Sequence, residues 1–129
     1  NIYLDGLDQL MKHKLKVKHY IRYADDFVIL SESRNWLVKI LPKIKNFLRD
    51  ELKLEIHPDK IFIKTISLGV DFLGWVHFPD HRVLRTSTKR RMFRNLRVNF
   101  SEETIVSYLG MLGWGNTFGL RQFVVGKLR

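Results

Sequence analysis

Apolar positions along the chain repeat with helical spacing in two N-terminal segments. Within residues 1–18 they fall three or four apart, and this spacing predicts a helix that ends in a lysine-rich connection. A second stripe extends from Leu37 to Leu52 behind Ser33, a residue type that can cap a helix N-terminus. Pro42 lies inside that stripe, so we expect a kink or a break there.

Strand-like runs separate and follow these helices. His19–Tyr23 and Phe27–Leu30 are rich in β-branched and aromatic residues and flank a short acidic turn, which predicts a hairpin. Four consecutive apolar residues in the second run predict a strand that is covered on both faces, in the middle of a packed sheet. Further strands are predicted at Leu54–His57, Ile61–Ile63, Val70–Phe78 and Val83–Leu84, with turns at Pro58–Asp59 and Pro79–His81.

The C-terminal third contains residues that typically begin and end helices. One helix capped by Thr86, Ser87 or Thr88 reaches Arg97, a second capped by Ser101 reaches the region of Leu112, and a third ends near Lys127. The pattern as a whole predicts an α+β fold, with an α+β lobe at residues 1–85 and a helical lobe at residues 86–129.

Composition narrows the class of protein. Among 129 residues, 23 Lys+Arg against 13 Asp+Glu leave a net charge of +10, while 45% hydrophobic residues exclude a disordered basic tail. The lack of Cys excludes disulfides, thiolate zinc sites and cysteine nucleophiles. Neither a spanning apolar stretch nor a signal peptide is present, so we expect a cytoplasmic protein without a membrane partner. Because no linker stands at either end, we expect a piece of a longer protein.

Positive charge is concentrated in residues 82–97, which carry seven Lys and Arg residues and no acid. Helical spacing places Arg90, Arg94 and Arg97 on one face. A solvated helix face is the ordinary explanation of such a run, but unrelieved like charge favours a helix laid along a phosphate backbone. The alternating lysines of residues 12–18 are weaker support, since they fit the outer side of an edge segment.

Asp25 and Asp26 form the strongest candidate for a chemical site. An isolated acidic turn usually faces water, but two adjacent carboxylates in a central hairpin are suited to hard divalent cations, above all Mg²⁺ and also Mn²⁺. Such ions in a basic protein indicate two-metal phosphoryl transfer on a nucleic acid. Neighbouring residues of a strand cannot aim both side chains the same way, so a further acid is needed. Asp5 and Asp8 are poor candidates for that ligand.

The sequence Tyr23-Ala24-Asp25-Asp26 resembles the Y-x-D-D hairpin of reverse transcriptases, the RNA-directed DNA polymerases. Three more segments resemble motifs of the bacterial retroelement enzymes of the group II intron, retron and diversity-generating types. These segments are Asn1–Leu4 with Leu7-Asp8, His57–Lys60 with Ile61, and Gly69–Trp75. The resemblance covers residues 1–97 in the family's order, and the helical remainder fits the thumb position more loosely.

The resemblance implies the C-terminal half of a polymerase palm at residues 1–85 and a helical thumb at residues 86–129. It also implies an RNA template, a DNA primer and deoxynucleoside triphosphates as partners, with two Mg²⁺ ions as cofactors. Asp25 and Asp26 would be the catalytic metal ligands, and Lys60 would lie near the nucleotide phosphates. Primer and template would contact Tyr23, Phe72, Leu73, Gly74, Trp75, Lys89, Arg90, Arg91, Arg94 and Arg97.

Ordinary structural roles remain open for several of these residues, since Lys60 can be a turn lysine and Tyr23 can be strand packing. The family carries another metal-binding Asp and the fingers upstream, so we expect residues 1–129 alone not to polymerise. Two alternatives stay open. One is a nucleic-acid-binding module without catalysis, and the other is a non-templated polymerase of phage defence on the same palm.

Overall fold

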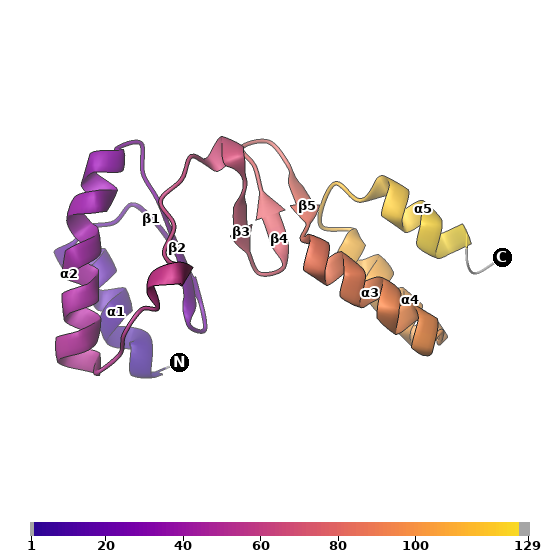
Figure 1. Ribbon diagram of the computed structural model, residues 1–129, viewed down its shortest axis with the longest axis horizontal. Coiled ribbons are helices and arrows are strands. Elements are labelled where there is room, and N and C mark those ends of the chain that lie inside the picture. Colours follow the sequence, from indigo (N-terminus) through magenta and orange to yellow (C-terminus); the bar gives the residue numbers. More distant parts are fainter. Residues whose placement is uncertain (1, 127–129) are drawn as a thin grey trace. The chain divides into compact units, whose positions relative to one another are not determined.

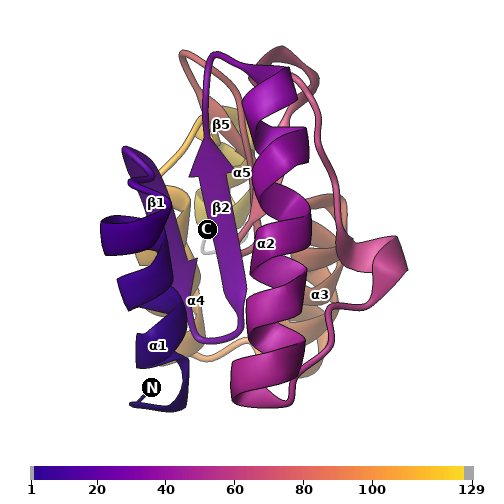
Figure 2. The same cartoon turned by 90° about the vertical axis from the view of Figure 1, so that its left-hand side faces the viewer.

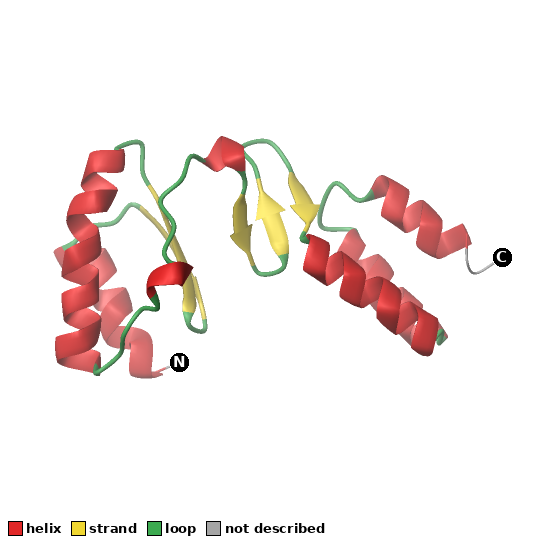
Figure 3. Cartoon of the chain, viewed as in Figure 1, coloured by secondary structure: helices red, strands yellow, loops and turns green. Residues whose placement is uncertain are grey.

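The computed structural model describes residues 2–126 and is a mixture of helices and small antiparallel sheets, as the α+β expectation requires (Figure 1, Figure 3). Contacts divide the chain into two compact units, residues 1–63 and residues 64–129, which are described separately below. No helix in the described part of the chain is long and apolar enough to cross a membrane.

Unit 1 begins with a helical segment of mixed type. A 3₁₀ turn at Ile2–Leu4 leads into α1 (Asp5–Gln9), and a π-helical turn follows at Leu10–Lys14. In that turn the Leu15 amide donates to the Leu10 carbonyl at 2.9 Å, five residues back. The predicted helix is therefore present, although it ends at Lys14, ahead of Lys16 with its positive φ of 51°.

A hairpin follows, formed by β1 (His19–Tyr23) and β2 (Asp26–Leu30), as predicted (Figure 2). Tyr23 pairs with Asp26, so the connecting loop consists of two residues, Ala24 and Asp25. Ala24 has a φ of 51°, in the left-handed region that two-residue hairpin loops commonly require.

The prediction that β2 lies in the middle of a packed sheet, covered on both faces, is wrong within the described part of unit 1. The sheet there has two strands, and one of its faces carries exposed side chains. One face of the hairpin packs on the core of unit 1 through side chains that include Tyr20 and Phe27. Residues of the other face are exposed, among them Ile21 and Tyr23, the latter to 64%. The apolar run thus reflects β propensity as well as burial.

The long helix α2 (Arg34–Leu52) packs against this hairpin and α1. The Ser33 hydroxyl caps it by accepting from the Trp36 amide at 3.2 Å, as predicted. No break occurs at Pro42. Buried residues lie on both sides of the proline, and their packing in one core outweighs the lost backbone hydrogen bond. The buried members of that core are Leu4, Leu7, Leu10, Met11, Val17, Ile40, Ile44 and Leu48.

The two strands predicted at Leu54–His57 and Ile61–Ile63 are absent from the structure. Leu54 and Ile56 are half-buried with exposed Glu55 between them, so the alternation of burial expected of a strand is present. No neighbouring strand pairs with this segment, and a 3₁₀ turn at Pro58–Lys60 interrupts it. Alternation alone therefore could not distinguish a strand from an extended connection.

Unit 2 opens with a three-stranded antiparallel sheet of β3 (Val70–Phe72), β4 (Trp75–His77) and β5 (Arg82–Leu84). The single strand predicted at Val70–Phe78 is split by a two-residue turn at Leu73–Gly74. Both turn residues have positive φ values, 54° and 84°, which is the pattern of the tight turns that suit the twist of a hairpin.

Three helices complete unit 2: α3 (Thr86–Val98), α4 (Glu102–Leu112) and α5 (Phe118–Gly126). Ser101 caps α4 as predicted, whereas none of the expected hydroxyls caps α3. The N-cap position of α3 belongs to Arg85, which leaves Thr86–Thr88 inside the helix. The predicted end of α5 near Lys127 lies outside the described residues. The buried core consists of Leu84, Met92, Leu96, Ile105, Leu112 and Val124.

Candidate functional site

The acid pair of unit 1 lies at the tip of the β1–β2 hairpin. Asp25 is the second loop residue, and Asp26 is the first residue of β2, opposite Tyr23. Both aspartates are exposed, and neither carboxylate has a hydrogen bond or ion pair with a described residue. Most other aspartates are engaged: Asp8 with Arg22, Asp50 with Arg49, Asp59 with His57, Asp71 with Arg85 and Asp80 with His81. The pair at the tip is therefore available to an external cation.

A second acid, Asp8 on α1, is committed to a network on the inward face of β1. Its carboxylate accepts from Arg22 Nε at 2.8 Å and from Arg22 Nη2 at 2.5 Å, and it also accepts from the Tyr20 hydroxyl at 2.7 Å. The Arg22 hydrogen bonds lower the pKa of Asp8 to about 2. Burial, followed by the Asp8 carboxylate, raises the pKa of the Tyr20 hydroxyl. The expectation that Asp8 is a poor metal ligand agrees with this engagement.

Arg22 also connects this network to the hairpin tip. Its Nη1 donates to the Ala24 carbonyl at 2.9 Å, in the loop that carries Asp25. One guanidinium thus joins α1 to the loop beside the acid pair. Sequence reasoning missed Arg22. The signal that could have found it is a charged residue at an inward position of β1, where Tyr20 and Arg22 alternate with exposed residues.

The donor set at the tip fits a hard divalent cation only in part. Two exposed, unpaired carboxylates supply the oxygen ligands that Mg²⁺ prefers. Within residues 2–126, however, no cluster of three or more acidic or histidine side chains could hold a metal ion. Asp25 and Asp26 therefore need additional ligands, from water, a substrate or another acid.

Lys60 lies at the end of the 3₁₀ turn Pro58–Lys60 and is exposed. No hydrogen bond or ion pair joins it to Asp25 or Asp26. In Figure 2 this turn and the tip of the β1–β2 hairpin lie apart, on either side of α2 in that view. The structure therefore does not bring Lys60 into contact with the acid pair.

The β3–β4 hairpin contains the four residues expected to support a primer. Phe72 pairs with Trp75, and both are half-buried, while Leu73 at the turn is 47% exposed. The Arg85 amide donates to the Gly74 carbonyl at 2.9 Å, which attaches the turn to the start of α3. Leu73 combines exposure with a left-handed backbone, an arrangement that costs a leucine about 1–2 kcal/mol.

The basic face of α3 is as expected. Met92 and Leu96 are buried, and five cations on the remaining surface are exposed. None of these five makes an ion pair with a described residue, so their charge is not neutralised locally. They are Lys89, Arg90, Arg91, Arg94 and Arg97.

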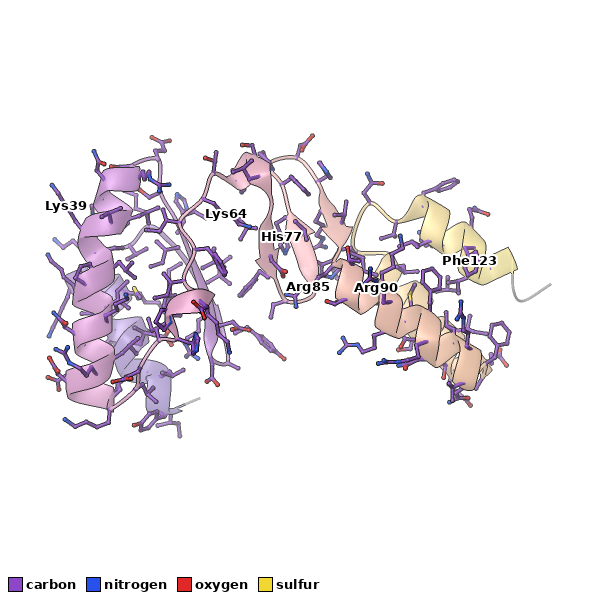
Figure 4. All side chains as sticks on the ribbon, viewed as in Figure 1. Lys39, Lys64, His77, Arg85, Arg90 and Phe123 are labelled. Atoms are coloured by element: carbon purple, nitrogen blue, oxygen red, sulfur yellow. The ribbon has the colours of Figure 1, made fainter. Side chains whose placement is uncertain are left out.

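An open depression of about 760 Å³ lies at the N-terminal end of α3, where Figure 4 shows Arg85 and Arg90. Arg85 forms an ion pair with Asp71 of β3, while its Nε is buried without a hydrogen-bond partner among the described residues. Asp71 compensates only one of the cations around the depression. The net positive charge of the lining therefore favours binding of an anion. Its lining consists of Asp71, Val76, Arg85, Thr86, Ser87, Arg90, Arg91 and Arg94. The sequence singled out three of these residues, Arg90, Arg91 and Arg94.

Comparison with known proteins identifies the family. Residues 1–78 match the model of the reverse transcriptase (RNA-dependent DNA polymerase) family. The chain is 43% identical over 61 residues to a putative COX1/OXI3 intron 2 protein of Saccharomyces cerevisiae, covering 46% of this chain and 7% of that protein. It is 38% identical over 77 residues to the group II intron-encoded protein LtrA of Lactococcus lactis subsp. cremoris, covering 59% of this chain and 12% of that protein.

The first relative is named as an intron protein and the second as a group II intron-encoded protein, which agrees with the retroelement type expected from the motifs. The matched region includes the β1–β2 hairpin with its acid pair and ends beyond the β3–β4 hairpin. The chain spans a small fraction of the length of these relatives. With the family model covering residues 1–78 of 129, the chain belongs to the reverse transcriptase family.

Proposed function

We propose that this chain is part of an RNA-directed DNA polymerase and contributes Asp25 and Asp26 to its catalytic centre. The observation that carries the proposal is the pair of exposed, unpaired carboxylates at a hairpin tip that Arg22 ties to α1. The substrates would be an RNA template, a DNA primer and deoxynucleoside triphosphates. Membership of the family supports this assignment.

The residues at the tip would hold divalent metal, with two Mg²⁺ ions as the cofactor and Mn²⁺ as a substitute. Bound there, the metal would activate the primer 3′-hydroxyl for attack on the α-phosphate and stabilise charge on the leaving pyrophosphate. The role of Asp25 and Asp26 is to supply anionic oxygen ligands at a fixed position. Further ligands must complete the coordination, in agreement with the absence of a three-residue cluster among residues 2–126.

Other residues would position the nucleic acid. Tyr23 lies opposite Asp26 and is exposed, so it can contact the primer end. The turn at Leu73 and Gly74, in which Leu73 is exposed, would support the primer strand, together with Phe72 and Trp75. Lys60 would lie near the nucleotide phosphates as a charge stabiliser or proton donor, and we assign it that role from the motif alone. The basic face of α3 would contact primer–template phosphates through Lys89, Arg90, Arg91, Arg94 and Arg97.

The corresponding subdomains would be a partial palm at residues 1–85 and a helical thumb at residues 86–129. The contact division at residues 63 and 64 falls earlier, because the β3–β4–β5 sheet packs with the helices of unit 2. A palm that includes this sheet therefore extends into the second contact unit.

A nucleic-acid-binding module without catalysis is the second candidate function. It is favoured by one observation: the cationic face of α3 is made entirely of residues of unit 2 and needs nothing from the acid pair. A non-templated polymerase would use the same carboxylates, and only its independence of template would distinguish it.

The test is Asp25→Asn in the full-length protein that contains this chain. Primer extension on an RNA template should fall by at least about 100-fold, the order of loss when a group that stabilises transition-state charge is removed. Duplex binding and the circular dichroism spectrum should not change, because Asp25 is exposed and unpaired.

Asp5→Asn is the matched control, since Asp5 is another exposed aspartate without a hydrogen bond or ion pair to any residue that the structure describes. It should leave extension intact. Undiminished synthesis by Asp25→Asn would make the acid pair a solvated turn and leave the binding module as the function. Synthesis that survives removal of the template would favour the non-templated polymerase.

A further inference from the structure

Trp114 is a large aromatic residue that unit 2 leaves 70% exposed. It lies in the connection between α4 and α5. Tryptophan is enriched at binding interfaces, where it offers a large apolar face together with a polar N–H group.

Contacts on both sides fix the loop that carries Trp114. Arg82 of β5 donates through Nε to the Trp114 carbonyl, and the Asn116 amide donates to the Arg82 carbonyl at 2.9 Å. Gly115 lies so close to β4 that a Cβ atom there would collide with the indole ring of Trp75. The Thr117 hydroxyl is buried and donates to the Leu112 carbonyl. Trp114 is therefore exposed from a rigid backbone.

The turn between β4 and β5 supplies further aromatic surface beside this loop. The rings of Phe78 and His81 stack with centroids 4.7 Å apart and an interplanar angle of 10°. The Phe78 amide donates to the His81 carbonyl at 2.8 Å, and His81 Nδ1 lies 2.7 Å from Asp80 Oδ1. Turn and loop together border an open pocket of about 490 Å³, lined by His77, Phe78, Pro79, Asp80, His81, Arg82, Trp114, Gly115 and Asn116.

The chemistry of this pocket suits a planar heterocycle. Trp114 offers an exposed aromatic face, and the Asn116 side chain is exposed and makes no hydrogen bond with a described residue. An aromatic face with an amide beside it is the combination that proteins use to stack an unpaired base and to read its edge. We propose that this pocket binds an unpaired nucleobase of single-stranded nucleic acid by stacking on Trp114.

Charge argues for the base as the recognised group. Arg82 is the one permanent cation of the lining, and the Asp80 carboxylate offsets it. A phosphate would therefore gain little in this pocket, in contrast to the arginine-lined depression at α3. The proposal extends the proposed function, since both concern nucleic acid, but it shares no residue with the acid pair or with the basic face of α3.

The test compares Trp114→Ala with the unchanged 129-residue chain in binding to two fluorescein-labelled oligonucleotides of equal length. One is oligothymidylate, and the other carries abasic sites throughout and so has the same charge without bases. Trp114→Ala should weaken binding to oligothymidylate by at least about fivefold, as expected when one base loses its stacking partner. Binding to the abasic strand should stay the same, and Trp114→Phe should restore most of the affinity.

Phe62→Ala is the matched control, because Phe62 is 74% exposed and belongs to unit 1. It should bind both oligonucleotides as the unchanged chain does. Unaltered oligothymidylate binding by Trp114→Ala, or an equal loss on the abasic strand, would overturn the proposal. Duplex binding through α3 and primer extension are measured separately, so failure of the proposed function would appear in those assays and not in this one.

Discussion

Arg22 on β1 holds the carboxylate of Asp8 on α1 with two hydrogen bonds, Nε to Oδ1 at 2.8 Å and Nη2 to Oδ2 at 2.5 Å. The two residues are 14 positions apart, and only 13% and 21% of their side-chain surfaces are exposed. This bidentate pair is among the few charge-assisted contacts in unit 1 that are largely shielded from water, which strengthens it relative to a surface ion pair.

We predict that Asp8→Asn lowers the free energy of unfolding by about 2 kcal/mol at neutral pH, and that this loss becomes smaller as the pH falls. The folded pKa of Asp8 is about 2, below the ordinary value of 3.8. Its stabilising effect is therefore complete above pH 4 and is lost as the pH falls toward 2. Urea unfolding at a series of pH values measures this directly.

The difference in stability between the unchanged chain and Asp8→Asn should shrink across that acid range. Asp50→Asn is the control, because the Arg49–Asp50 pair is exposed and water screens it, so its loss should change the stability less than the loss of Asp8 does. A difference that stays constant from pH 7 to pH 2 would show that Asp8 acts through packing and not through its charge.

A second prediction concerns the left-handed backbone at Leu73. Replacing Leu73 by Asn should stabilise unit 2 by about 1 kcal/mol, since Asn tolerates a φ of 54° better than Leu does. Thermal unfolding measures the change. Leu68→Asn is the control, because Leu68 is an exposed leucine without a positive φ. If both variants shift the melting temperature alike, side-chain exposure and not backbone strain is responsible.

Two glycines of unit 2 should respond to alanine in opposite directions. Gly115→Ala should destabilise the unit by about 1–3 kcal/mol, because the new methyl group would overlap the Trp75 ring. Gly110→Ala should stabilise it by about 0.5–1 kcal/mol, because Gly110 lies inside α4 with open space where a Cβ would be. Chemical denaturation of both variants is the measurement, and the same sign for both would contradict the packing described for the loop.

The basic face of α3 predicts a particular salt dependence. Replacing Arg90, Arg94 and Arg97 by Gln should weaken duplex binding about equally across sequences. The slope of log affinity against log salt should flatten by up to about 2.7, or 0.9 for each of three phosphate contacts.

Replacing Lys12, Lys14 and Lys16 by Gln removes the same charge and serves as the control for the arginine variant. The lysine variant should keep most of the slope. If the lysines and not the arginines set the slope, the nucleic acid contacts unit 1 and the thumb assignment of α3 fails.

Local signals predicted those parts of the fold that depend on neighbours in sequence. The Tyr23–Asp26 hairpin and the caps at Ser33 and Ser101 are formed within a few residues, and all three were predicted. The prediction of a strand at Leu54–His57 is wrong, because a strand needs a neighbouring strand to pair with, and a local pattern cannot indicate whether one is present. Of the kink or break predicted at Pro42, the break is wrong, because tertiary packing outweighs a local preference.

The residues of the candidate site likewise comprise some that local patterns indicate and some that depend on partners distant in the sequence. Asp25 and Asp26 were found from a short motif, and the Arg90 face from helical spacing, while their roles remain predictions. Arg22 was missed because its partner Asp8 lies 14 residues away. The close contact between Gly115 and the Trp75 ring involves positions 40 apart in the sequence, so no local pattern could indicate it.

The two-stranded sheet of unit 1 has a consequence for handling the isolated chain. Each of its strands pairs on one side only, so both present backbone donors and acceptors along an open edge. Exposed apolar side chains, Ile21 and Leu30 among them, accompany these edges. Another strand, such as one from a second copy of the chain, can extend the ladder by pairing with these groups. The fraction of self-associated chain should therefore increase with protein concentration, and Ile21→Lys should reduce it.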